Sequence, residues 1–561
     1  MHLSALLFVV TLFCPQEMGA EAAADAPAPP EPPVEISTLC GRCHSSAPRA
    51  SALRDASGRE IGPYDLWQSS MMAASARDPL WRAVLSAEVD AIPSRQRDIE
   101  ATCMRCHTPM ADRIGLDDHD TGSLLHLLEC DSRLGELARD GVSCTVCHGM
   151  SPEGLGTDAS FSSGFVLNDE RRMFGPHEKP FTMPMRHHTS FTPSFGEHVM
   201  RSAMCGSCHT VETEVFTAAG DDTGARFLEQ APYLEWRNSA FDTERAETRA
   251  QAASCQACHM PTVDVDGVPI ETRIARNPGG RDFPPVRPRS PFGRHVFVGG
   301  NTLVLSMFRD HGEALGAPAP PEAYQATIDA ARHALRHDTA RLAMEDITRD
   351  GSSLSFDVVV RNLTGHKLPT AHPTRRVWLR VLVRDARGEL LFASGDVDEA
   401  GRILGGDGRP LASETAGGPV QPHRRRIASP DEVALWRAVM ADVDGQPTHT
   451  LVAGARWFVD NRLLPLGWSP DHVEASRTRP VGVDDDPDFR AGQDRVRIEL
   501  QLGAAVDGPL SIEVDLLYQS LSARWAAELF ERDTAEIRRF RALYEGADRT
   551  PEVLAHGSAG L

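Results

Sequence analysis

Lysine is almost absent from this chain of 561 residues: of its 58 basic residues, only Lys179 and Lys367 are lysines. The basic residues are also outnumbered by 79 acidic residues, which gives a formal net charge of −21. This excess of negative charge argues against binding to nucleic acid or to anionic membrane surfaces. After the N-terminal region, no segment approaches the ~18 uninterrupted apolar residues of a membrane-spanning helix, so none is predicted.

The N-terminal region predicts export. Residues 2–13 form a short apolar run followed by small residues, and we interpret residues 1–24 as a secretory signal peptide, although its first residues include no lysine or arginine. A lipid anchor at Cys14 is an alternative that Phe13 disfavours, because a small residue is needed there. Residues 25–35 are rich in proline and predict an extended leader.

Cysteine and histidine recur in one short pattern. Ten of the 12 cysteines lie in the pentapeptide Cys-x-x-Cys-His, which occurs five times. These copies, motifs 1 to 5, are Cys40-x-x-Cys43-His44, Cys103-x-x-Cys106-His107, Cys144-x-x-Cys147-His148, Cys205-x-x-Cys208-His209 and Cys255-x-x-Cys258-His259. Two thiols and an adjacent imidazole at this spacing attach a c-type haem, with the histidine as proximal iron ligand. The sequence therefore predicts five covalently attached haem c groups.

Zinc binding and thiol redox chemistry fit these paired cysteines less well. Structural zinc sites use two Cys-x-x-Cys knuckles, or one knuckle and a spaced histidine pair, and do not need histidine after every second cysteine. A thioredoxin-like pair would occur once and follow a strand.

Cys130 is the odd cysteine once Cys14 leaves with the signal peptide. We expect it to be a buried, inert thiol, with intermolecular pairing or redox chemistry as alternatives.

A weak internal repeat accompanies the motifs. Residues 64–70 and 233–239 share the pattern Tyr-x-x-Trp-x-x-Ser, and each copy precedes a Cys-x-x-Cys-His motif. Two amphipathic helices with buried aromatic residues would produce this repeat, and so would duplication of a unit that packs against haem. The sequence leaves both possibilities open.

Between residues 36 and 380, further stretches resemble a bacterial multihaem cytochrome c family related to the tetrahaem electron acceptor of hydroxylamine oxidoreductase. These stretches are Trp67–Met72 with Arg77–Pro79, Gly141–His148, Gly175–His177, Pro180–Met185, His295–Asn301 and Thr364–Thr370. In the wider superfamily, a Trp-x-x-Ser-x-His pattern supplies a distal iron ligand. Here Met72 stands at the histidine position, and Phe241 stands there in the second copy, so the resemblance does not imply two histidines on every iron.

The sixth ligand of each iron decides between electron transfer alone and substrate binding at an open position. The predicted distal ligands are His198, His295, His188, His366, His177 and Met72, followed by His187, His119 and His126. Each histidine could instead be a hydrogen-bonded loop residue. The histidines His372, His423, His449, His472 and His556 are expected to be ordinary surface or β-domain residues.

From Ser352 onwards the apolar residues recur with a period of two. The alternating segments are Leu354–Val360, Val377–Val383, Val496–Leu502 and Leu510–Leu516, with turns at Asp385–Gly388 and Val506–Pro509. This pattern predicts antiparallel strands of a β-sandwich. A helix rich in alanine, leucine and arginine is expected before it, over Ala323–Ile347, and another after it, with Asp533 as N-cap.

The predicted fold class is therefore α+β, with several domains. Residues 36–315 are expected to form a mostly helical and irregular pentahaem domain with few strands. Residues 316–350 are expected to form a linker and helix, residues 351–520 a β-sandwich, and residues 521–561 a C-terminal helix and tail. If His366 binds iron, it ties the β-sandwich to the haem groups.

The preferred interpretation is an exported pentahaem c-type cytochrome, periplasmic or extracellular, that carries electrons between redox partners such as other cytochromes. Most of its haems are expected to be six-coordinate. One alternative is an oxidoreductase in which one open haem acts on a small nitrogen or sulfur compound. Another is a subunit of an extracellular haem filament assembled through the β-sandwich, and a homo-oligomer is also open. An electron carrier is favoured over an enzyme because the candidate ligands outnumber the irons.

Overall fold

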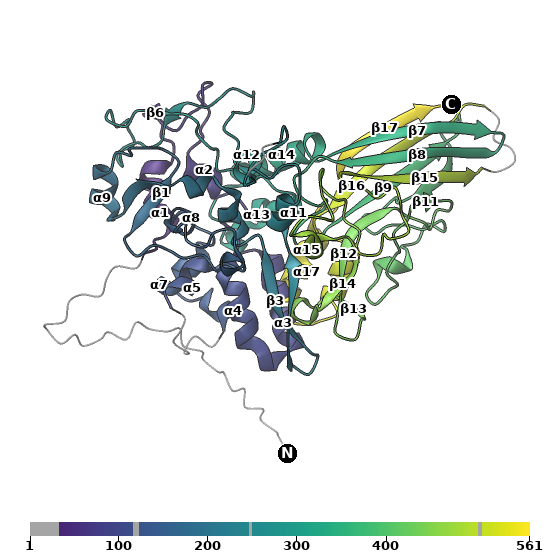
Figure 1. Ribbon diagram of the computed structural model, residues 1–561, viewed down its shortest axis with the longest axis horizontal. Coiled ribbons are helices and arrows are strands. Elements are labelled where there is room, and N and C mark those ends of the chain that lie inside the picture. The colour runs from purple at the N-terminus through teal and green to yellow at the C-terminus, as the bar shows by residue number, and fades with distance from the viewer. Residues whose placement is uncertain (1–32, 116–122, 246–248, 503–507) are drawn as a thin grey trace, which may run out of the picture.

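Helices dominate the first part of the molecule and strands the second, as Figure 1 shows in this computed structural model. The structure describes residues 33–115, 123–245, 249–502 and 508–561, so the predicted signal peptide and most of the leader lie outside it. Among the helices that it describes, none is long and apolar enough to cross a membrane. We call residues 33–337 the helical half and residues 340–561 the sheet half.

The helical half consists of short helices joined by long irregular segments. Its helices are α1 (Ser37–His44), α2 (Pro63–Trp67), α3 (Pro79–Ala91), α4 (Gln96–His107), α5 (Pro109–Arg113), α6 (Leu124–Leu127), α7 (Arg133–Arg139), α8 (Cys144–Gly149), α9 (Met183–Thr189), α10 (Ser202–Gly206), α11 (Pro232–Arg237), α12 (Cys255–His259), α13 (Thr302–Leu315) and α14 (Pro321–His337). Several begin with proline at the first helical position, where its missing N–H costs no hydrogen bond.

Three small pairs of strands interrupt these helices. The pairs are β1 (Arg172–Gly175) with β2 (Thr192–Phe195), β3 (Val211–Phe216) with β4 (Asp222–Gln230), and β5 (Thr272–Arg273) with β6 (Pro288–Arg289). The expectation of few strands in this region is met apart from the β3–β4 hairpin. That hairpin carries Glu229, which is buried.

Two sheets make up the sheet half. Their strands are β7 (Ala340–Asp350), β8 (Ser353–Asn362), β9 (Arg376–Arg384), β10 (Leu390–Ser394), β11 (Arg426–Ile427), β12 (Leu435–Ala441), β13 (Pro447–Thr448), β14 (Arg456–Asp460), β15 (Gln493–Gln501), β16 (Ser511–Gln519) and β17 (Glu552–Gly560). One sheet has the order β11-β15-β8-β7, and the other has the order β13-β12-β9-β16-β17, with β10 on β9 and β14 on β12. A short helix, α15 (Ala475–Thr478), lies between β14 and β15.

The two sheets share one apolar core. Phe356 and Val358 of β8 are fully buried together with Val514 and Leu516 of β16, and alternate residues of β9 and β15 join the same cluster. Alternation along each strand therefore points one set of side chains between the sheets. The strands expected from the period of two are confirmed, and so is the turn at Asp385–Gly388. The turn at 506–509 lies partly outside the described residues.

The segment after α14 differs from the prediction. The helix ends at His337 and does not continue to Ile347, because β7 begins at Ala340. Ala340 is fully buried, and Leu342 and Met344 pack against the same core, as expected of alternate residues in a strand. Pairing with β8 outweighs the helix propensity of this segment.

The C-terminal region contains two helices and a strand, and not the one helix and tail that the sequence suggested. Helices α16 (Ala523–Leu529) and α17 (Ala535–Gly546) are followed by β17, which pairs with β16. The N-cap of α17 is Thr534 and not Asp533, because the Thr534 hydroxyl accepts the amide proton of Ile537.

Both C-terminal helices pack against the helical half. Trp525 of α16 and Phe540 of α17 share one buried cluster with Val84 of α3, Phe308 of α13 and Tyr324 of α14. The chain therefore returns from the sheets to close the helical half.

Candidate haem-binding cavity

One connected cavity of about 2670 Å³ runs through the helical half. Both cysteines and the histidine of all five motifs line it. Ordinary small-molecule pockets enclose ~300–1,000 Å³, so this cavity has room for several large groups. The five motifs, which are far apart in the sequence, thus face one shared space.

Short helices present the motifs to the cavity. Helices α1, α4 and α12 end at His44, His107 and His259, while α8 holds motif 3 and α10 leads into motif 4. Residues three apart lie on the same face of a helix, so both cysteines of a motif point the same way. The following histidine then lies beside them.

Four proximal histidines have the same ring orientation. Their Nδ1 atoms lie beside backbone carbonyls: His44 beside Ile274 at 2.9 Å, His107 beside Ser75 at 3.0 Å, His148 beside Phe174 at 2.6 Å and His259 beside Val298 at 2.6 Å. A carbonyl only accepts hydrogen bonds, so Nδ1 carries the proton and Nε2 has a free lone pair. This is the usual arrangement of a metal-binding histidine.

Two proximal histidines face a second histidine across the cavity. The ring centres of His148 and His295 are 6.2 Å apart at an interplanar angle of 25°, and those of His259 and His366 are 6.5 Å apart at 19°. Two imidazoles on opposite sides of one metal ion, each bonded at about 2.0–2.1 Å, have ring centres roughly 6–6.5 Å apart. The side chains at motifs 3 and 5 therefore fit a haem iron between them.

The two facing histidines are also oriented to bind metal. Nδ1 of His295 donates to the carbonyl of Gly293 at 3.1 Å, and Nδ1 of His366 donates to that of Lys367 at 2.9 Å. Both rings thus keep an unprotonated Nε2, as four of the motif histidines do.

The first copy of the repeat joins motif 1 to motif 3. The ring of Tyr64 lies so close to the backbone of motif 1 that a Cβ atom at Gly41 would be 2.9 Å away from it. Trp67, one turn later in α2, donates from its indole nitrogen to the carbonyl of Val142, just before motif 3, at 2.9 Å. One short helix thereby fixes two motifs.

The second copy has the same contacts at motifs 4 and 5. A Cβ atom at Gly206 would lie 2.6 Å from the ring of Tyr233, and Trp236 donates to the carbonyl of Ala253, just before motif 5, at 2.9 Å. The glycine, the tyrosine, the tryptophan and the accepting carbonyl thus occupy equivalent positions in both copies. This geometry supports duplication of a packing unit over two unrelated amphipathic helices.

Sulfur contacts give the order of the motifs in space. Three pairs of cysteines from different motifs lie within hydrogen-bonding distance: Cys40 with Cys144, Cys106 with Cys208, and Cys205 with Cys255. Cys147 is also close enough to Cys208 for their charges to interact. Motif 4 therefore adjoins motifs 2, 3 and 5, whereas motif 1 adjoins motif 3.

Of the other predicted ligands, His198 has the opposite orientation. Its Nε2 is bonded to the carbonyl of Met150 at 2.9 Å, and it does not line the cavity. His177, His187, His188 and Met72 do line the cavity. No ring contact between described residues pairs these three histidines with a proximal histidine.

Two further residues singled out in the sequence, His126 and Cys130, do not line the cavity. His126 is in α6. His119 lies outside the described residues, between residues 115 and 123. Cys130 is fully buried, as predicted.

The loop between β8 and β9, residues 363–375, enters the cavity from the sheet half. It carries the predicted ligand His366, and it also presents His372 and Arg375 to the cavity. His372 was expected to be an ordinary surface or β-domain residue, whereas its side chain lines the cavity. The available signal was its place in the same short loop as His366.

A buried network of charges holds this loop in place. Nζ of Lys367 lies 2.6 Å from Asp460, whose carboxylate also binds Arg462 through two contacts of 2.7 and 2.8 Å. Arg462 reaches Glu235 of α11 at 3.1 Å, and the same carboxylate accepts the backbone amide of Lys367 and the hydroxyl of Thr370. The one buried lysine of the chain thus links the sheet half to the helical half beside His366.

The charges of this network are matched. Burial raises the pKa of Asp460, but the neighbouring Arg462 and Lys367 outweigh it and hold the pKa at about 2. Removing one partner of a buried ion pair costs ~3–5 kcal/mol, so the network fixes the loop strongly.

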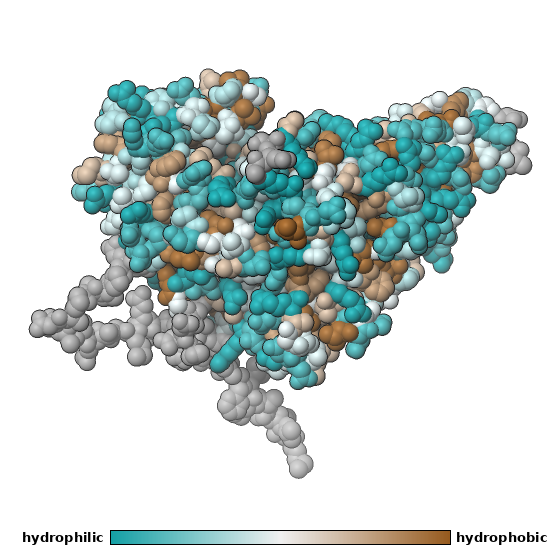
Figure 2. All heavy atoms as spheres, viewed as in Figure 1, coloured by the Kyte–Doolittle hydropathy of each residue, from teal (hydrophilic) through white to brown (hydrophobic). Residues whose placement is uncertain are grey.

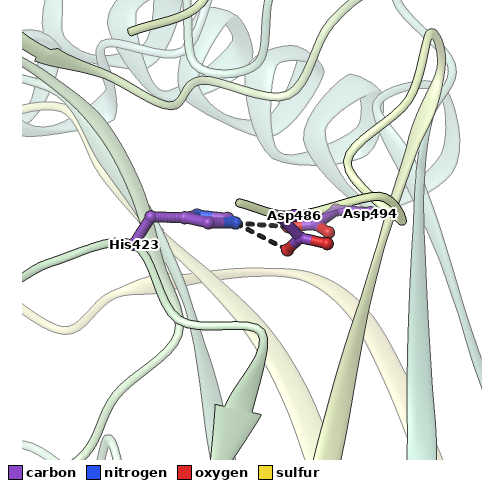
Figure 3. Close-up of side chains that lie close together, drawn as sticks. All are labelled: His423, Asp486 and Asp494. Atoms are coloured by element: carbon purple, nitrogen blue, oxygen red, sulfur yellow. Dashed lines mark hydrogen bonds and ion pairs between the residues drawn. The ribbon is translucent and has the colours of Figure 1, made fainter. Parts of the chain in front are cut away.

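A second cluster of possible metal ligands lies in the sheet half. His423 points at Asp486 and Asp494, with its Nε2 at 2.9 and 3.9 Å from their carboxylate oxygens (Figure 3). Asn461 donates to Nδ1 of the same ring at 3.1 Å, and hydrogen bonds of 2.6 and 2.9 Å to the backbone of β12 fix its amide orientation. Nδ1 therefore accepts, and Nε2 carries the proton that it donates to Asp486. A protonated Nε2 does not bind a metal, so this cluster is a hydrogen-bonded one.

Of the comparisons with known proteins, a family match agrees with the motifs. The family model for cytochrome c554 and c-prime matches residues 204–277, which include motifs 4 and 5. The crystal structure of a penta-heme cytochrome c552 from Thermochromatium tepidum is similar at 16% identity and a TM-score of 0.48, over 94% of this chain and 99% of that chain. No curated protein matches the chain. Together with the five motifs, the family match supports a multihaem c-type cytochrome and, in general terms, electron transfer.

Proposed function

We propose that this protein is an exported pentahaem c-type cytochrome that carries electrons between redox partners. The observation that carries the proposal is the single cavity lined by all five Cys-x-x-Cys-His motifs. When bound, five haem c groups would supply centres that accept and release single electrons. The chain's own part is to hold them close together and away from water.

The proposed holding residues fall into two sets. The ten motif cysteines would form the thioether bonds, and His44, His107, His148, His209 and His259 would bind from the proximal side. On the distal side, His295 would serve motif 3 and His366 motif 5, because only these two show the required ring separation among the described residues. His177, His188 and Met72 line the cavity and remain candidate distal ligands. We do not propose His198 as a ligand, because its Nε2 is bonded to a backbone carbonyl.

Filled distal positions favour a carrier over an enzyme. A histidine on each side of an iron leaves no position for a substrate. At motifs 3 and 5 the structure offers such pairs, held by backbone hydrogen bonds on both sides. We therefore keep electron transfer as the function and do not assign a substrate.

The surface suggests the kind of partner. The face shown in Figure 2 is largely hydrophilic, with hydrophobic residues scattered in small groups. With a formal charge of −21, the protein would attract partners through positively charged patches, which increases the rate of association at low salt. Such partners would be other redox proteins in the periplasm or outside the cell.

Haem counting and electron paramagnetic resonance test this proposal. The pyridine haemochrome assay on purified protein is expected to give five haems per chain, and the oxidised protein should show low-spin ferric signals. Replacing His366 by alanine should convert one haem to high spin, whereas replacing the exposed His337 should change nothing. Fewer than five haems, or an unchanged spectrum for His366→Ala, would contradict the corresponding part of the proposal.

A further inference from the structure

We propose that the end of the helical half farthest from the sheet half is a docking surface for an acidic redox protein, which exchanges electrons with the haem at motif 1. This inference rests on the proposed function, because it presupposes a haem at that motif. The surface is built by residues 172–195, which run from β1 to β2, and by residues 272–294, which contain β5 and β6. Figure 1 places α9, β1 and β6 at this end, which we call the basic end.

The charge of these two segments is opposite to that of the whole chain. Residues 172–195 contain three basic residues and one acidic residue, and residues 272–294 contain six basic residues and one acidic residue. Their combined formal charge is therefore +7, in a chain whose formal charge is −21. A local excess of one sign attracts a partner whose surface has the opposite sign.

Direct contacts join the two segments into one surface. The guanidinium of Arg289 donates to the backbone carbonyl of Lys179 at 3.2 Å. The rings of Phe181 and Phe283 also lie against each other, with centres 5.9 Å apart. Basic and aromatic side chains that are about 100 residues apart in the sequence therefore form one continuous patch.

Several cations of the basic end are exposed and have no acidic partner. Lys179, Arg186 and Arg287 are exposed, and no carboxylate within the described ranges forms an ion pair with any of them. Arg172 differs, because it pairs with Glu170 at 2.5 Å. An unpaired surface cation keeps its charge available, so three such side chains can contact acidic groups of a partner.

The haem cavity opens at the same place. Phe181 and Met183 are 47% and 63% exposed, and both also line the cavity. The exposed side chains of Lys179 and Arg287 line it too. Side chains that reach both solvent and cavity mark the mouth of the cavity. Exposed apolar residues beside charged ones are typical of a protein–protein interface, so a partner docked here would cover the mouth.

The basic end also supports the motif at the edge of the array. Nδ1 of His44, in motif 1, donates to the carbonyl of Ile274 in one segment. Nδ1 of His148, in motif 3, donates to the carbonyl of Phe174 in the other. The sulfur contacts between described residues join motif 1 to motif 3 alone. A haem at motif 1 would therefore end the array, where electrons can pass to a partner.

The mouth favours a redox protein over other negatively charged occupants. An anionic lipid surface or a second copy of this chain would need only the basic and apolar side chains. Electron exchange needs, in addition, access to a haem, and the cavity mouth supplies that access. With the acidic remainder of the chain free for a basic partner, donor and acceptor could bind at different faces.

The test compares the double variant Arg186→Glu/Arg287→Glu with the wild type and with Arg387→Glu/Arg409→Glu, all as full-length holoprotein. The control pair reverses two exposed arginines of the sheet half. The probe is reduced flavodoxin, a small acidic flavoprotein, mixed with the oxidised protein in a stopped-flow instrument. One electron leaves the flavin and one ferric haem iron becomes ferrous, which the haem absorbance records.

We expect the wild-type rate constant to fall as salt is added, because screening weakens the attraction. At low salt, Arg186→Glu/Arg287→Glu should react ~10-fold more slowly than the wild type, and the control variant should keep the wild-type rate. The neutral variant Arg186→Gln/Arg287→Gln should lie between them. Equal rates in the charge-reversal variant and the control would overturn the docking surface, and so would a wild-type rate that rises with salt.

The other occupants have outcomes of their own. Self-association in sedimentation velocity, or binding to phosphatidylglycerol vesicles, that charge reversal abolishes without changing the rate would overturn the assignment to a redox protein. Haem counting separates this inference from the proposed function. Fewer than five haems in the wild type would contradict the proposed function, whereas five haems with equal rates would contradict the docking surface alone.

Discussion

The two halves of the molecule obtain their cores in different ways. In the sheet half, one continuous cluster of buried side chains fills the space between two sheets. In the helical half, five smaller clusters lie apart from one another beside a cavity of about 2670 Å³, and α16 and α17 complete the largest of the five. Burial of apolar surface is the main driving force of folding. The stability of a region with such a cavity therefore depends on the groups that fill it.

This contrast indicates where the cofactor enters the folding of the chain. The sheet half builds its core from its own side chains, whereas the helical half leaves the centre of its core to the haem groups that we propose at the five motifs. Metal and cofactor sites that are absent from the unfolded chain contribute their binding energy to folding. Removing haem should therefore damage one half and spare the other.

The largest effect is expected from removing a motif, and it should depend on which one. Replacing Cys205 and Cys208 by serine removes the motif that adjoins three others, whereas replacing Cys40 and Cys43 removes one at the edge. We expect the motif 1 variant to retain four haems. The motif 4 variant should retain fewer than four and be recovered in several-fold lower amount. Haem content and yield check this, and equal losses in the two variants would contradict the central place of motif 4.

A large effect confined to the sheet half is expected from Phe356→Ala. The side chain is fully buried between the two sheets, and such truncations cost ~3–5 kcal/mol of unfolding free energy. Denaturant unfolding followed by tryptophan fluorescence measures the loss. The haem absorbance of the folded protein should stay unchanged, because the residue does not line the cavity. A changed haem spectrum would show that the halves are less separate than their cores indicate.

A smaller effect is expected where a tyrosine packs on a motif. In Gly206→Ala, the new Cβ atom would lie 2.6 Å from the ring of Tyr233, so the ring or the motif must shift, at ~1–3 kcal/mol. Gly546→Ala is the matched control, since nothing lies within 4 Å of its Cβ position in α17. Thermal unfolding should separate the two variants. If they have equal stability, the tight contact between Tyr233 and motif 4 is not important.

The smallest effect is a pH dependence in the sheet half. Burial raises the pKa of Asp494 to about 7, from about 3.9 in an unfolded chain. Between these values the folded state binds the proton more tightly, so stability falls as pH rises, by about 1 kcal/mol between pH 6 and 7. Unfolding at several pH values should show a flatter profile for Asp494→Asn than for the wild type. Replacing the exposed Asp533 by asparagine should leave the profile as it is.

Local patterns predicted much of both halves. The period of two located β8, β9, β15 and β16, and the five motifs located the lining of the cavity. Ala340–Ile347 was misassigned to a helix because its composition favours helix, and only pairing with β8 shows that it belongs to a strand. Strand β17 was missed because its pairing with β16 is a long-range contact.

Distal ligands were harder to predict than proximal ones for a physical reason. A proximal histidine is adjacent in sequence to its cysteines, whereas a distal one comes from any segment that folds over the cavity. His198 had a favourable position in the sequence, but its Nε2 is bonded to a backbone carbonyl.

Hydrogen exchange of the chain, prepared with and without haem attachment, tests the contrast between the two halves most directly. In the haem-loaded protein, amides in the helices that carry the motifs and in β8, β9, β15 and β16 should both be protected. In the haem-free chain, we expect protection to persist in β8, β9, β15 and β16 and to be lost across the helices that carry the motifs. Equal protection of both halves without haem would show that the helical half has a sufficient core of its own, and would contradict the dependence of that half on haem.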